Sequence, residues 1–453
     1  MTHAEKAALF LEDEARTDWH NESLWLVRGK RDKIIGPIPE WEDLRALGSA
    51  IKDSVLSRMD EYLEEFERNA TANGVQVHWA ADAAEHNRIV HEILAKHEVR
   101  HIVKSKSMLT EECGLNEHLI EQGIDVIDTD LGERIIQLKQ EPPSHIVMPA
   151  IHLKKEEIGE LFHEHLQTDK GASDPQYLTE AARQHLREKF LNAQAAVTGV
   201  NFGVAETGGV VVCTNEGNAD MGVHTAPVQI HCMGIEKVIP KAAHLGVFTR
   251  LLGRSATGQP ITIYTSHHHR PKPGGEMHVV LVDNGRSKQL GRPDFRNSLK
   301  CIRCGACMNT CPIYRRSGGH SYGSVIPGPI GSILTPGLDL EKHKDLPFAS
   351  TLCGSCSDVC PVKIDIHEQL YKWRQVVSEE DLLEGRKRHP LAATGRVLQH
   401  NGLYNFMGKA ARVALKILPR AAVYNGLNEW GKTRELPDVP AESFKEWYQK
   451  NKA

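Results

Sequence analysis

Residues 301–312, CIRCGACMNTCP, and residues 353–361, CGSCSDVCP, decide the character of this chain. In the first stretch four cysteines are spaced C-x2-C-x2-C-x3-C and are followed by Pro312. This is the bacterial iron-sulfur spacing, in which the first three thiolates bind one cluster and the fourth binds a different cluster. Two intervening residues let a tight loop wrap three corners of a cube, and zinc sites rarely use this triple spacing. We therefore predict iron-sulfur clusters in this region.

The second stretch repeats the last three cysteines of the first and places Ser350 where the first cysteine would stand. Crossed ligation follows from this alignment. One [4Fe-4S] cluster is then held by Cys301, Cys304, Cys307 and Cys360, and the other is held by Cys311, Cys353 and Cys356. The second cluster has no obvious fourth thiolate, and serine is a poor iron ligand. Its fourth iron is then held by solvent or another side chain, or is lost to give a [3Fe-4S] centre.

Composition limits the kind of protein to which these clusters belong. The 453 residues suggest two to four domains, and 55 basic against 59 acidic side chains give a net charge of -4. This balance argues against nucleic acid or an anionic membrane as partner. The N-terminus lacks a secretory pattern, and no apolar run is long enough for a spanning helix. We predict a cytoplasmic protein without a membrane span, in which ten cysteines serve metal rather than disulfides.

Upstream of the cysteines, short β-rich runs alternate with helical patterns, as in a parallel sheet covered on both faces. A long amphipathic helix is predicted over 41–73 and helices over 81–97, 111–122 and 131–138. Strands are predicted at 75–80, 101–105, 125–129 and 145–150, and a second β-rich block over 197–281 contains one helix near 242–252. The predicted class is α/β, with a helical two-cluster ferredoxin module and a small helical extension. The boundaries are 1–70 (helical), 71–296 (α/β), 297–375 (two-cluster ferredoxin) and 376–453 (extension).

Polar groups interrupt the α/β pattern where strands end, which is where such domains bind ligands. They give a candidate small-acid or phosphate site at Lys104, Lys106, Glu206 and Asn215. The alternative is that these groups are only caps and turns. Three adjacent histidines, 267–269, favour a solvated loop over a metal site. Of the remaining cysteines, Cys213 and Cys232 lie in apolar runs and are predicted to be buried structural thiols, and Cys113 stands alone.

Seven further segments carry a resemblance over nearly the whole chain: KSKSM at Lys104, TDLGE at Thr129, PPSHIV at Pro142, AETG at Ala205, TNEGN at Thr214, VDNGRS at Val282 and GGHSYGS at Gly318. With the cysteine runs they resemble the lactate-utilisation protein B family, the iron-sulfur subunits of a three-protein bacterial system that oxidises L-lactate to pyruvate. The resemblance implies an α/β domain related to coenzyme A transferases and sugar isomerases, a helical ferredoxin and a family extension. It also implies two partners, a cysteine-rich subunit and a smaller protein that shares the α/β domain.

The leading hypothesis is therefore an electron-transfer subunit of an L-lactate-oxidising complex that is not active alone. Two alternatives stay open: an enzyme that binds lactate in its own α/β domain, and a redox-sensing or assembly protein. Against the first, GVNFGVAETGG at 199–209 is β on both sides and lacks the context of a dinucleotide fingerprint. No catalytic residue can be assigned from the sequence.

Overall fold

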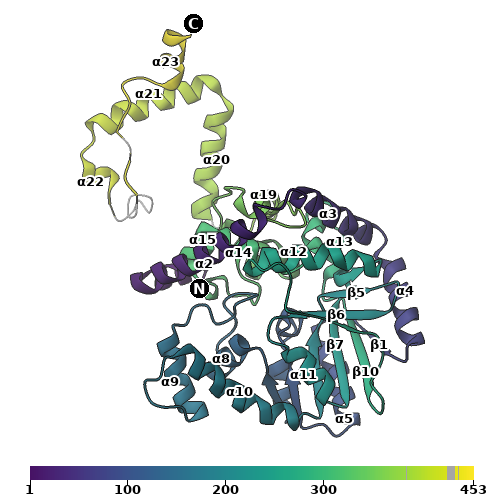
Figure 1. The fold of residues 1–453 in the computed structure, drawn as a ribbon. Helices are drawn as coiled ribbons and strands as arrows, with labels where there is room; N and C mark the ends of the chain where they lie inside the picture. Colours follow the sequence, from purple (N-terminus) through teal and green to yellow (C-terminus); the bar gives the residue numbers. More distant parts are fainter. Residues whose placement is uncertain (384, 426–433, 437, 453) are drawn as a thin grey trace. The chain divides into compact units, whose positions relative to one another are not determined.

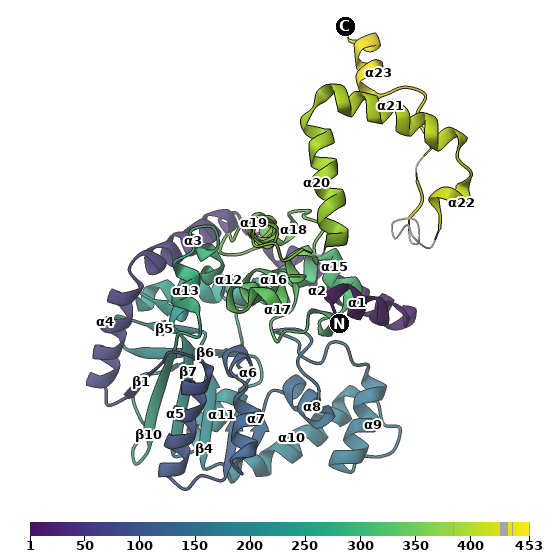
Figure 2. The same ribbon diagram turned by 180° about the vertical axis from the view of Figure 1, so that it is seen from behind.

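The computed structural model describes residues 1–383, 385–425, 434–436 and 438–452. The chain forms two compact units, Met1–Val376 and Val377–Ala453 (Figures 1 and 2). The first unit contains the α/β domain and the cysteine module, and the second is helical. The predicted fold class, α/β with a ferredoxin-type module and a helical extension, is confirmed.

A six-stranded parallel sheet forms the centre of the α/β domain, with strand order β1-β10-β7-β4-β2-β3. Its strands are β1 (Gln76–Ala80), β2 (His101–Lys104), β3 (Asp125–Asp128), β4 (Ala195–Gly199), β7 (Val228–Gly234) and β10 (Glu276–Val282). Parallel strands covered on both faces are buried along their length, as β7 is throughout and β4 is up to Thr198, although β7 also buries the polar side chains of Gln229 and His231. Helices α5 (Ala83–Lys96) and α7 (Leu115–Glu121) cover the face seen in Figure 2. Helix α4 (Met59–Ala72) packs on the opposite face.

A smaller four-stranded sheet adjoins this centre, with order β8-β5-β6-β9. Its strands are β5 (Phe202–Val204), β6 (Gly209–Thr214), β8 (Val238–Ile239) and β9 (Tyr264–His268). Helix α12 (Leu245–Thr257) packs against it through Phe248, whose ring stacks on Phe202 at 5.2 Å. Helices α8 (Leu131–Lys139), α9 (Lys155–Leu166), α10 (Pro175–Leu191) and α11 (Asn218–Thr225) complete the domain.

The N-terminal segment is helical: α1 (His3–Leu11), α2 (Glu14–Ile35) and α3 (Trp41–Ser57) precede α4. The prediction of one continuous helix over 41–73 was wrong. Arg58 leaves the helical conformation, with φ -142° and ψ 39°, and separates α3 from α4. The break lets the apolar faces of the two helices follow different layers, because α3 contributes to the core beneath the cysteine module while α4 lies on the sheet.

Two other local predictions differ from the structure. The helix predicted over 111–122 is divided into α6 (Met108–Glu112) and α7 by Gly114, which has φ +64°. Residues 145–150, predicted as a strand, form a loop. There the His145 Nδ1 atom accepts hydrogen bonds from the backbone N–H groups of Val147 and Met148, at 3.0 and 3.1 Å. These N–H groups are therefore not free to join a sheet.

The cysteine module is built from short helices between loops. They are α13 (Arg286–Leu290), α14 (Ala306–Thr310), α15 (Pro312–Ser317), α16 (Gly328–Leu338), α17 (Leu340–His343), α18 (Ser355–Asp358) and α19 (Ile366–Glu379). One hydrophobic core joins this module to α2, α3 and the small sheet, and includes Leu24, Phe202 and Trp373. This shared core makes residues 1–376 a single compact unit.

The second unit contains α20 (Gly385–Gln399), α21 (Asn401–Ile417), α22 (Arg420–Val423) and α23 (Phe444–Asn451). A capping box at Ser443 and an ion pair between Arg412 and Glu446, at 3.0 Å, tie α23 to α21. Positions 384, 426–433, 437 and 453 of the predicted extension lie outside the described residues. Within the described part of the chain, no helix has the length and apolarity needed to cross a membrane.

Candidate iron-sulfur sites and an adjoining cavity

The cysteines of the two sequence runs interleave in space. Cys301, Cys304, Cys307 and Cys360 line one small cavity together with apolar side chains. Three of these thiols come from the first run and the fourth comes from the second, which is the set that crossed ligation predicts for one cluster. The other three cysteines also lie together, because the thiols of Cys311 and Cys353 are close enough to Cys356 to raise its pKa.

The two cysteine loops have the same backbone conformation and the same pattern of N–H hydrogen bonds. In the first loop Arg303 and Gly305 have positive φ, +60° and +76°, and in the second Leu352 and Gly354 have +54° and +81°. The Arg303 N–H donates to Cys301 Sγ at 3.3 Å, and the Leu352 N–H donates to Ser350 Oγ at 3.0 Å. The Ser350 hydroxyl therefore occupies the structural position of the Cys301 thiol. Positive φ at a leucine is strained, and such strain persists where the surroundings impose it.

The thiols fit a metal cluster better than isolated buried side chains. Burial, followed by the neighbouring Cys360, raises the pKa of Cys304 to about 12. Burial, followed by Cys311 and Cys353, raises the pKa of Cys356 to about 12. Several such thiols packed together are costly to ionise without a cation, and metal binding displaces their protons. Cys356 of the second group is also close enough to Cys307 of the first group to raise its pKa, so the two sites adjoin each other.

Cations from other parts of the chain surround the first site. Arg31 of α2 donates to the carbonyl of Val359 at 3.0 Å, and Arg45 of α3 donates to the carbonyl of Cys360 at 3.1 Å. Lys237, which follows β7, donates to the carbonyl of Cys301 at 3.1 Å. An anionic cluster needs such compensation when it is buried. The second site differs, because Cys353 is exposed while Cys311 and Cys356 are buried.

A loop of the α/β domain, residues 144–149, supports the first cysteine loop. His145 is fully buried, and its Nε2 lies 2.9 Å from Asn309 Oδ1 of α14. Because its Nδ1 atom accepts two backbone N–H groups, Nε2 carries the proton and donates to Asn309. Burial lowers the pKa of His145 to about 3. The Tyr314 hydroxyl donates to the carbonyl of Ser144 at 2.5 Å, so the two modules are joined directly.

His152 in the same region contacts Ser144 Oγ at 2.7 Å and Glu141 Oε2 at 3.0 Å. The combination resembles a nucleophilic triad in composition, but Ser144 is 1% exposed and also donates to the Pro149 carbonyl. A buried hydroxyl that is already engaged cannot reach a substrate. We assign this group to the joint between the modules.

A cavity of about 480 Å³ lies at the carboxyl edge of the main sheet. The segments that follow β2, β3, β4 and β7 line it, with part of β6, part of α12, and Arg303 from the first cysteine loop. Carboxyl ends of parallel strands are the usual ligand position in α/β domains. The cavity extends to the loop that carries Cys301 and Cys304.

The four residues of the predicted ligand site separate in the structure. Lys106 and Asn215 line the cavity. Glu206 lies in the turn between β5 and β6, where its carboxylate accepts a hydrogen bond from the Ala242 N–H at 2.9 Å. Sequence reasoning missed Lys237 and Arg303, which also line the cavity. Arg303 could have been found from the sequence, because it lies between two of the predicted cluster cysteines. Nothing in the sequence around Lys237 distinguishes it as a ligand-binding residue.

Lys104 does not line the cavity and lies in a buried ion cluster. Its Nζ atom lies 2.7 Å from Asp128, 2.9 Å from Glu111 and 3.9 Å from Glu133. Burial alone would lower its pKa, but Asp128 and then Glu111 raise it well above the ordinary value. Burial raises the pKa of Glu133 well above its ordinary value, in spite of Lys104. Lys104 therefore anchors the ends of β2 and β3.

The histidine run and the lone cysteines are part of the fold. His267 and His268 belong to β9, so the prediction of a solvated loop was wrong, and the His268 ring stacks on His231 at 5.2 Å. Cys232 is buried as predicted, whereas Cys213 is only half-buried, so the prediction of a buried thiol was wrong for Cys213. Both cysteines line the cavity, and burial raises the pKa of Cys213 to about 11. Burial likewise raises the pKa of Cys113 to about 12.

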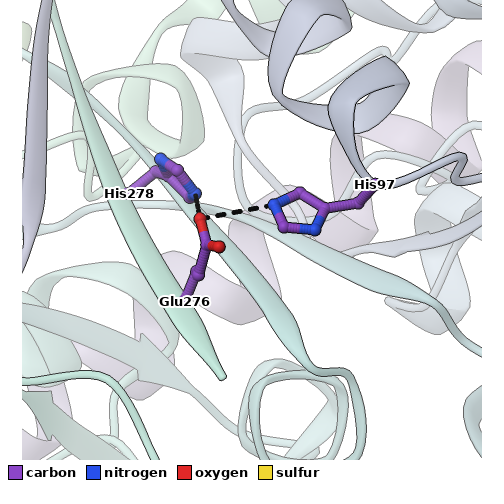
Figure 3. A group of neighbouring side chains, drawn as sticks. All are labelled: His97, Glu276 and His278. Atoms are coloured by element: carbon purple, nitrogen blue, oxygen red, sulfur yellow. Dashed lines mark ion pairs between the residues drawn. The ribbon is translucent and has the colours of Figure 1, made fainter. Parts of the chain in front are cut away.

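A group of possible metal ligands, His97, Glu276 and His278, lies at the opposite, amino edge of the sheet (Figure 3). Glu276 Oε2 lies 3.3 Å from His97 Nε2 and 3.4 Å from His278 Nε2. The same oxygen accepts from Gln76 Nε2 at 2.9 Å and Lys96 Nζ at 3.2 Å. These donors, Gln76 first, lower the pKa of Glu276 to about 2. The carboxylate is thus already surrounded by donors, and we assign it a structural role.

Comparisons with known proteins agree with this architecture. Residues 63–289 match the LUD domain family, 297–364 a 4Fe-4S dicluster domain, and 390–453 the family "Lactate utilisation protein B, C-terminal". The chain is 41% identical to lactate utilization protein B of Macrococcus caseolyticus, covering 93% of this chain and 91% of that protein. It is 43% identical to the protein of that name from Bacillus pumilus, covering 90% and 89%. It is 40% identical to the uncharacterized electron transport protein YkgF of Escherichia coli, covering 94% and 92%.

Glu133→Gln should make stability less sensitive to alkaline pH. A buried acid with a raised pKa keeps its proton when folded but releases it when unfolded above about pH 4.5. Rising pH therefore favours the unfolded state. The free energy of unfolding of the variant should exceed that of the wild type by a margin that grows by about 1 kcal/mol or more between pH 5.5 and 8.5. Anaerobic urea unfolding measures it. Glu121→Gln, an exposed control on α7, should follow the wild type at each pH, and parallel pH profiles for Glu133→Gln would contradict the prediction.

Crossed ligation predicts which cysteine variants share a phenotype. Cys360→Ser and Cys304→Ser should damage the same paramagnetic signal, and Cys311→Ser and Cys356→Ser should damage the other. The reason is that each pair lies in one thiol group although its members belong to different sequence runs. Electron paramagnetic resonance of the four reduced variants tests the pairing. Cys113→Ala, outside both groups, is the control and should keep both signals. Pairing by sequence run would show that ligation is not crossed.

Ser350→Cys should complete the second site. Seven thiolates predict two clusters and about seven to eight irons per chain, and the wild type should lose iron from the second cluster first. A new thiolate at position 350 should retain four irons in that cluster after air exposure. It should also lower the cluster's potential, because another anionic ligand favours the oxidised state. Iron and sulfide analysis with redox titration tests both effects, and Ser350→Ala is the matched control. An unchanged potential and equal iron retention would place a strong fourth ligand elsewhere.

Proposed function

Because the chain belongs to the lactate utilisation protein B family, we propose that it is the electron-transfer subunit of a complex that oxidises L-lactate to pyruvate. An iron-sulfur electron-transfer role in lactate utilisation follows from the family and its 4Fe-4S dicluster domain. Beyond that role, we propose the complex itself, its oxidation of L-lactate to pyruvate and its other subunits. The observation that carries it is the meeting of seven cysteines from two sequence runs at two adjoining sites.

We propose that the first site holds a [4Fe-4S] cluster on Cys301, Cys304, Cys307 and Cys360. The second site holds its cluster on Cys311, Cys353 and Cys356, with a corner near Ser350 that lacks a thiolate. Such clusters supply one-electron transfer when bound. The chain's own residues tune that transfer: Arg45 and Lys237 bring positive charge to the first site, and backbone N–H groups point at thiol sulfurs of both sites. Burial of the first site and exposure of Cys353 make the second site the exit for electrons.

Oxidation of lactate to pyruvate releases two electrons and two protons, whereas each cluster takes one electron at a time. The first acceptor of the electron pair must therefore be a two-electron group, and the sequence has no dinucleotide fingerprint to bind one. We propose that this acceptor belongs to a partner subunit. The partners that fit are the cysteine-rich protein and the smaller protein with a shared α/β domain that the family resemblance implies.

The isolated chain should not reduce a dye with L-lactate, and the complete complex should do so. Cys311→Ser should lower the rate of the complex by at least about tenfold, because it breaks the path between the two sites, whereas Cys113→Ala should not. Anaerobic dye reduction with the purified complex and each part measures this. Lactate-dependent turnover by the isolated chain at the rate of the complex would favour an enzyme with its own lactate site. Reversible cluster reduction without turnover in the complete complex would favour a redox-sensing or assembly protein.

A further inference from the structure

The cavity at the carboxyl edge of the main sheet has a basic end beside the first cysteine loop. Lys237 follows β7, and Arg303 lies between Cys301 and Cys304; both side chains line the cavity. The Lys237 ammonium donates one hydrogen bond, to the Cys301 carbonyl at 3.1 Å. An ammonium has three N–H groups, so it can donate to a ligand without breaking this contact.

Within the described residues, the Arg303 guanidinium has one carboxylate near it, that of Glu236, and this lies too far away for a hydrogen bond. Its Nη1 atom is buried and has no hydrogen-bond partner there. The nearest carboxylate is that of Glu236, at 4.0 Å from Nη2. The other oxygen of that carboxylate, Oε2, accepts a hydrogen bond from Arg286 Nε at 2.6 Å. A buried guanidinium nitrogen without a partner is costly, and an anionic oxygen is the group that would satisfy it.

The rest of the cavity restricts the kind of anion. Its walls include the apolar side chains of Ile135, Leu252 and Ala256, which favour an organic body over an inorganic ion. Asp130, Glu216 and Glu236 also line it, and these acidic groups disfavour a strongly charged dianion such as phosphate. Neutral donors and acceptors at Asn201 and Asn215 suit hydroxyl or carbonyl groups.

Cavity size gives a further limit. About 480 Å³ lies within the range of pockets that enclose small organic ligands and cofactors. A three-carbon acid occupies only part of such a space. Lactate is therefore at the small end of what the cavity accepts.

We propose that this cavity binds an organic hydroxy- or oxo-carboxylate, with the carboxylate held by Lys237 and Arg303 against the first cysteine loop. The inference deepens the proposed function, on which it rests for the expectation that L-lactate and pyruvate belong to the ligand class. It assigns binding to this chain and leaves the two-electron step to the partner's acceptor. A carboxylate here also places negative charge next to the ligands of the first cluster, so its binding should be visible in that cluster's signal.

Isothermal titration calorimetry of the anaerobic, cluster-loaded chain tests the site, with L-lactate, pyruvate, citrate and inorganic phosphate as probes. At least one carboxylate should bind saturably and shift the resonance of the cluster that Cys304→Ser removes. Lys237→Met and Arg303→Gln should each weaken that binding by at least about tenfold, since each removes a charged hydrogen bond.

Lys52→Met is the matched control. Lys52 is buried, has Cys301 among its charged neighbours and donates to the Glu236 carbonyl, but it does not line the cavity. It should change the cluster's potential, as Lys237→Met does, while carboxylate affinity stays within about twofold of the wild type. Cluster absorbance and iron content identify variants that have lost their cofactor.

Three results would overturn the inference: no saturable binding of any carboxylate, binding of phosphate alone, or equal loss of affinity in Lys52→Met and Lys237→Met. The last result would show that carboxylate affinity depends on the long-range field of the buried cations and not on contact between Lys237 and the ligand. Because binding is measured on this chain alone, its failure is separate from a failure of the complete complex to transfer electrons from lactate.

Discussion

Burying an anionic iron-sulfur cluster in protein costs free energy unless cations and N–H groups surround it. Much of this chain's architecture follows from that requirement. The cysteine loops supply N–H groups to Cys301 and Cys311 from their own backbone. Further positive charge comes from elsewhere: Arg31 and Arg45 from the N-terminal helices, and Lys237 from the α/β domain. These hydrogen bonds act together with the shared hydrophobic core to hold residues 1–376 in one compact unit.

The same contacts fix the position of the α/β domain relative to the clusters. Lys237 follows β7 at the carboxyl edge of the sheet, so its hydrogen bond to the first cysteine loop brings that edge, and the cavity within it, to the first site. His145 and Tyr314 hold the neighbouring loop on the other side. The cavity, the first thiol group and the second thiol group therefore adjoin one another in that order, and Cys353 of the second group is exposed.

The sequence predicted the parts whose signal is local. The cysteine spacing identified the clusters, and the alternation of short apolar runs with helical periodicity identified the parallel sheet. Predictions were wrong where one backbone position overrides periodicity, as at Arg58 and Gly114, or where a side chain takes the N–H groups of its neighbours, as His145 does. The cavity could not be predicted fully, because Lys237 and Arg303 lie far apart in sequence and meet only through the packing of two modules. Lys104 resembled a ligand residue because a lysine after a strand looks the same whether it faces a cavity or buried carboxylates.

The second cysteine loop shows what determines the shape of these loops. It holds Leu352 in the same left-handed conformation as Arg303, although Ser350 replaces the thiol toward which the first loop turns its N–H. That conformation costs about 1 kcal/mol or more at a residue with a bulky side chain. A hydrogen bond to a serine hydroxyl, worth about 1 kcal/mol, barely offsets this cost. The remaining stabilisation has to come from what the loop encloses. A cluster held by three thiolates would supply it, and would leave its fourth corner facing a hydroxyl that binds iron weakly. Under the proposed ligation the two sites would be unequal: the first would have four thiolates, three of them buried, and the second would have three thiolates, one of them exposed.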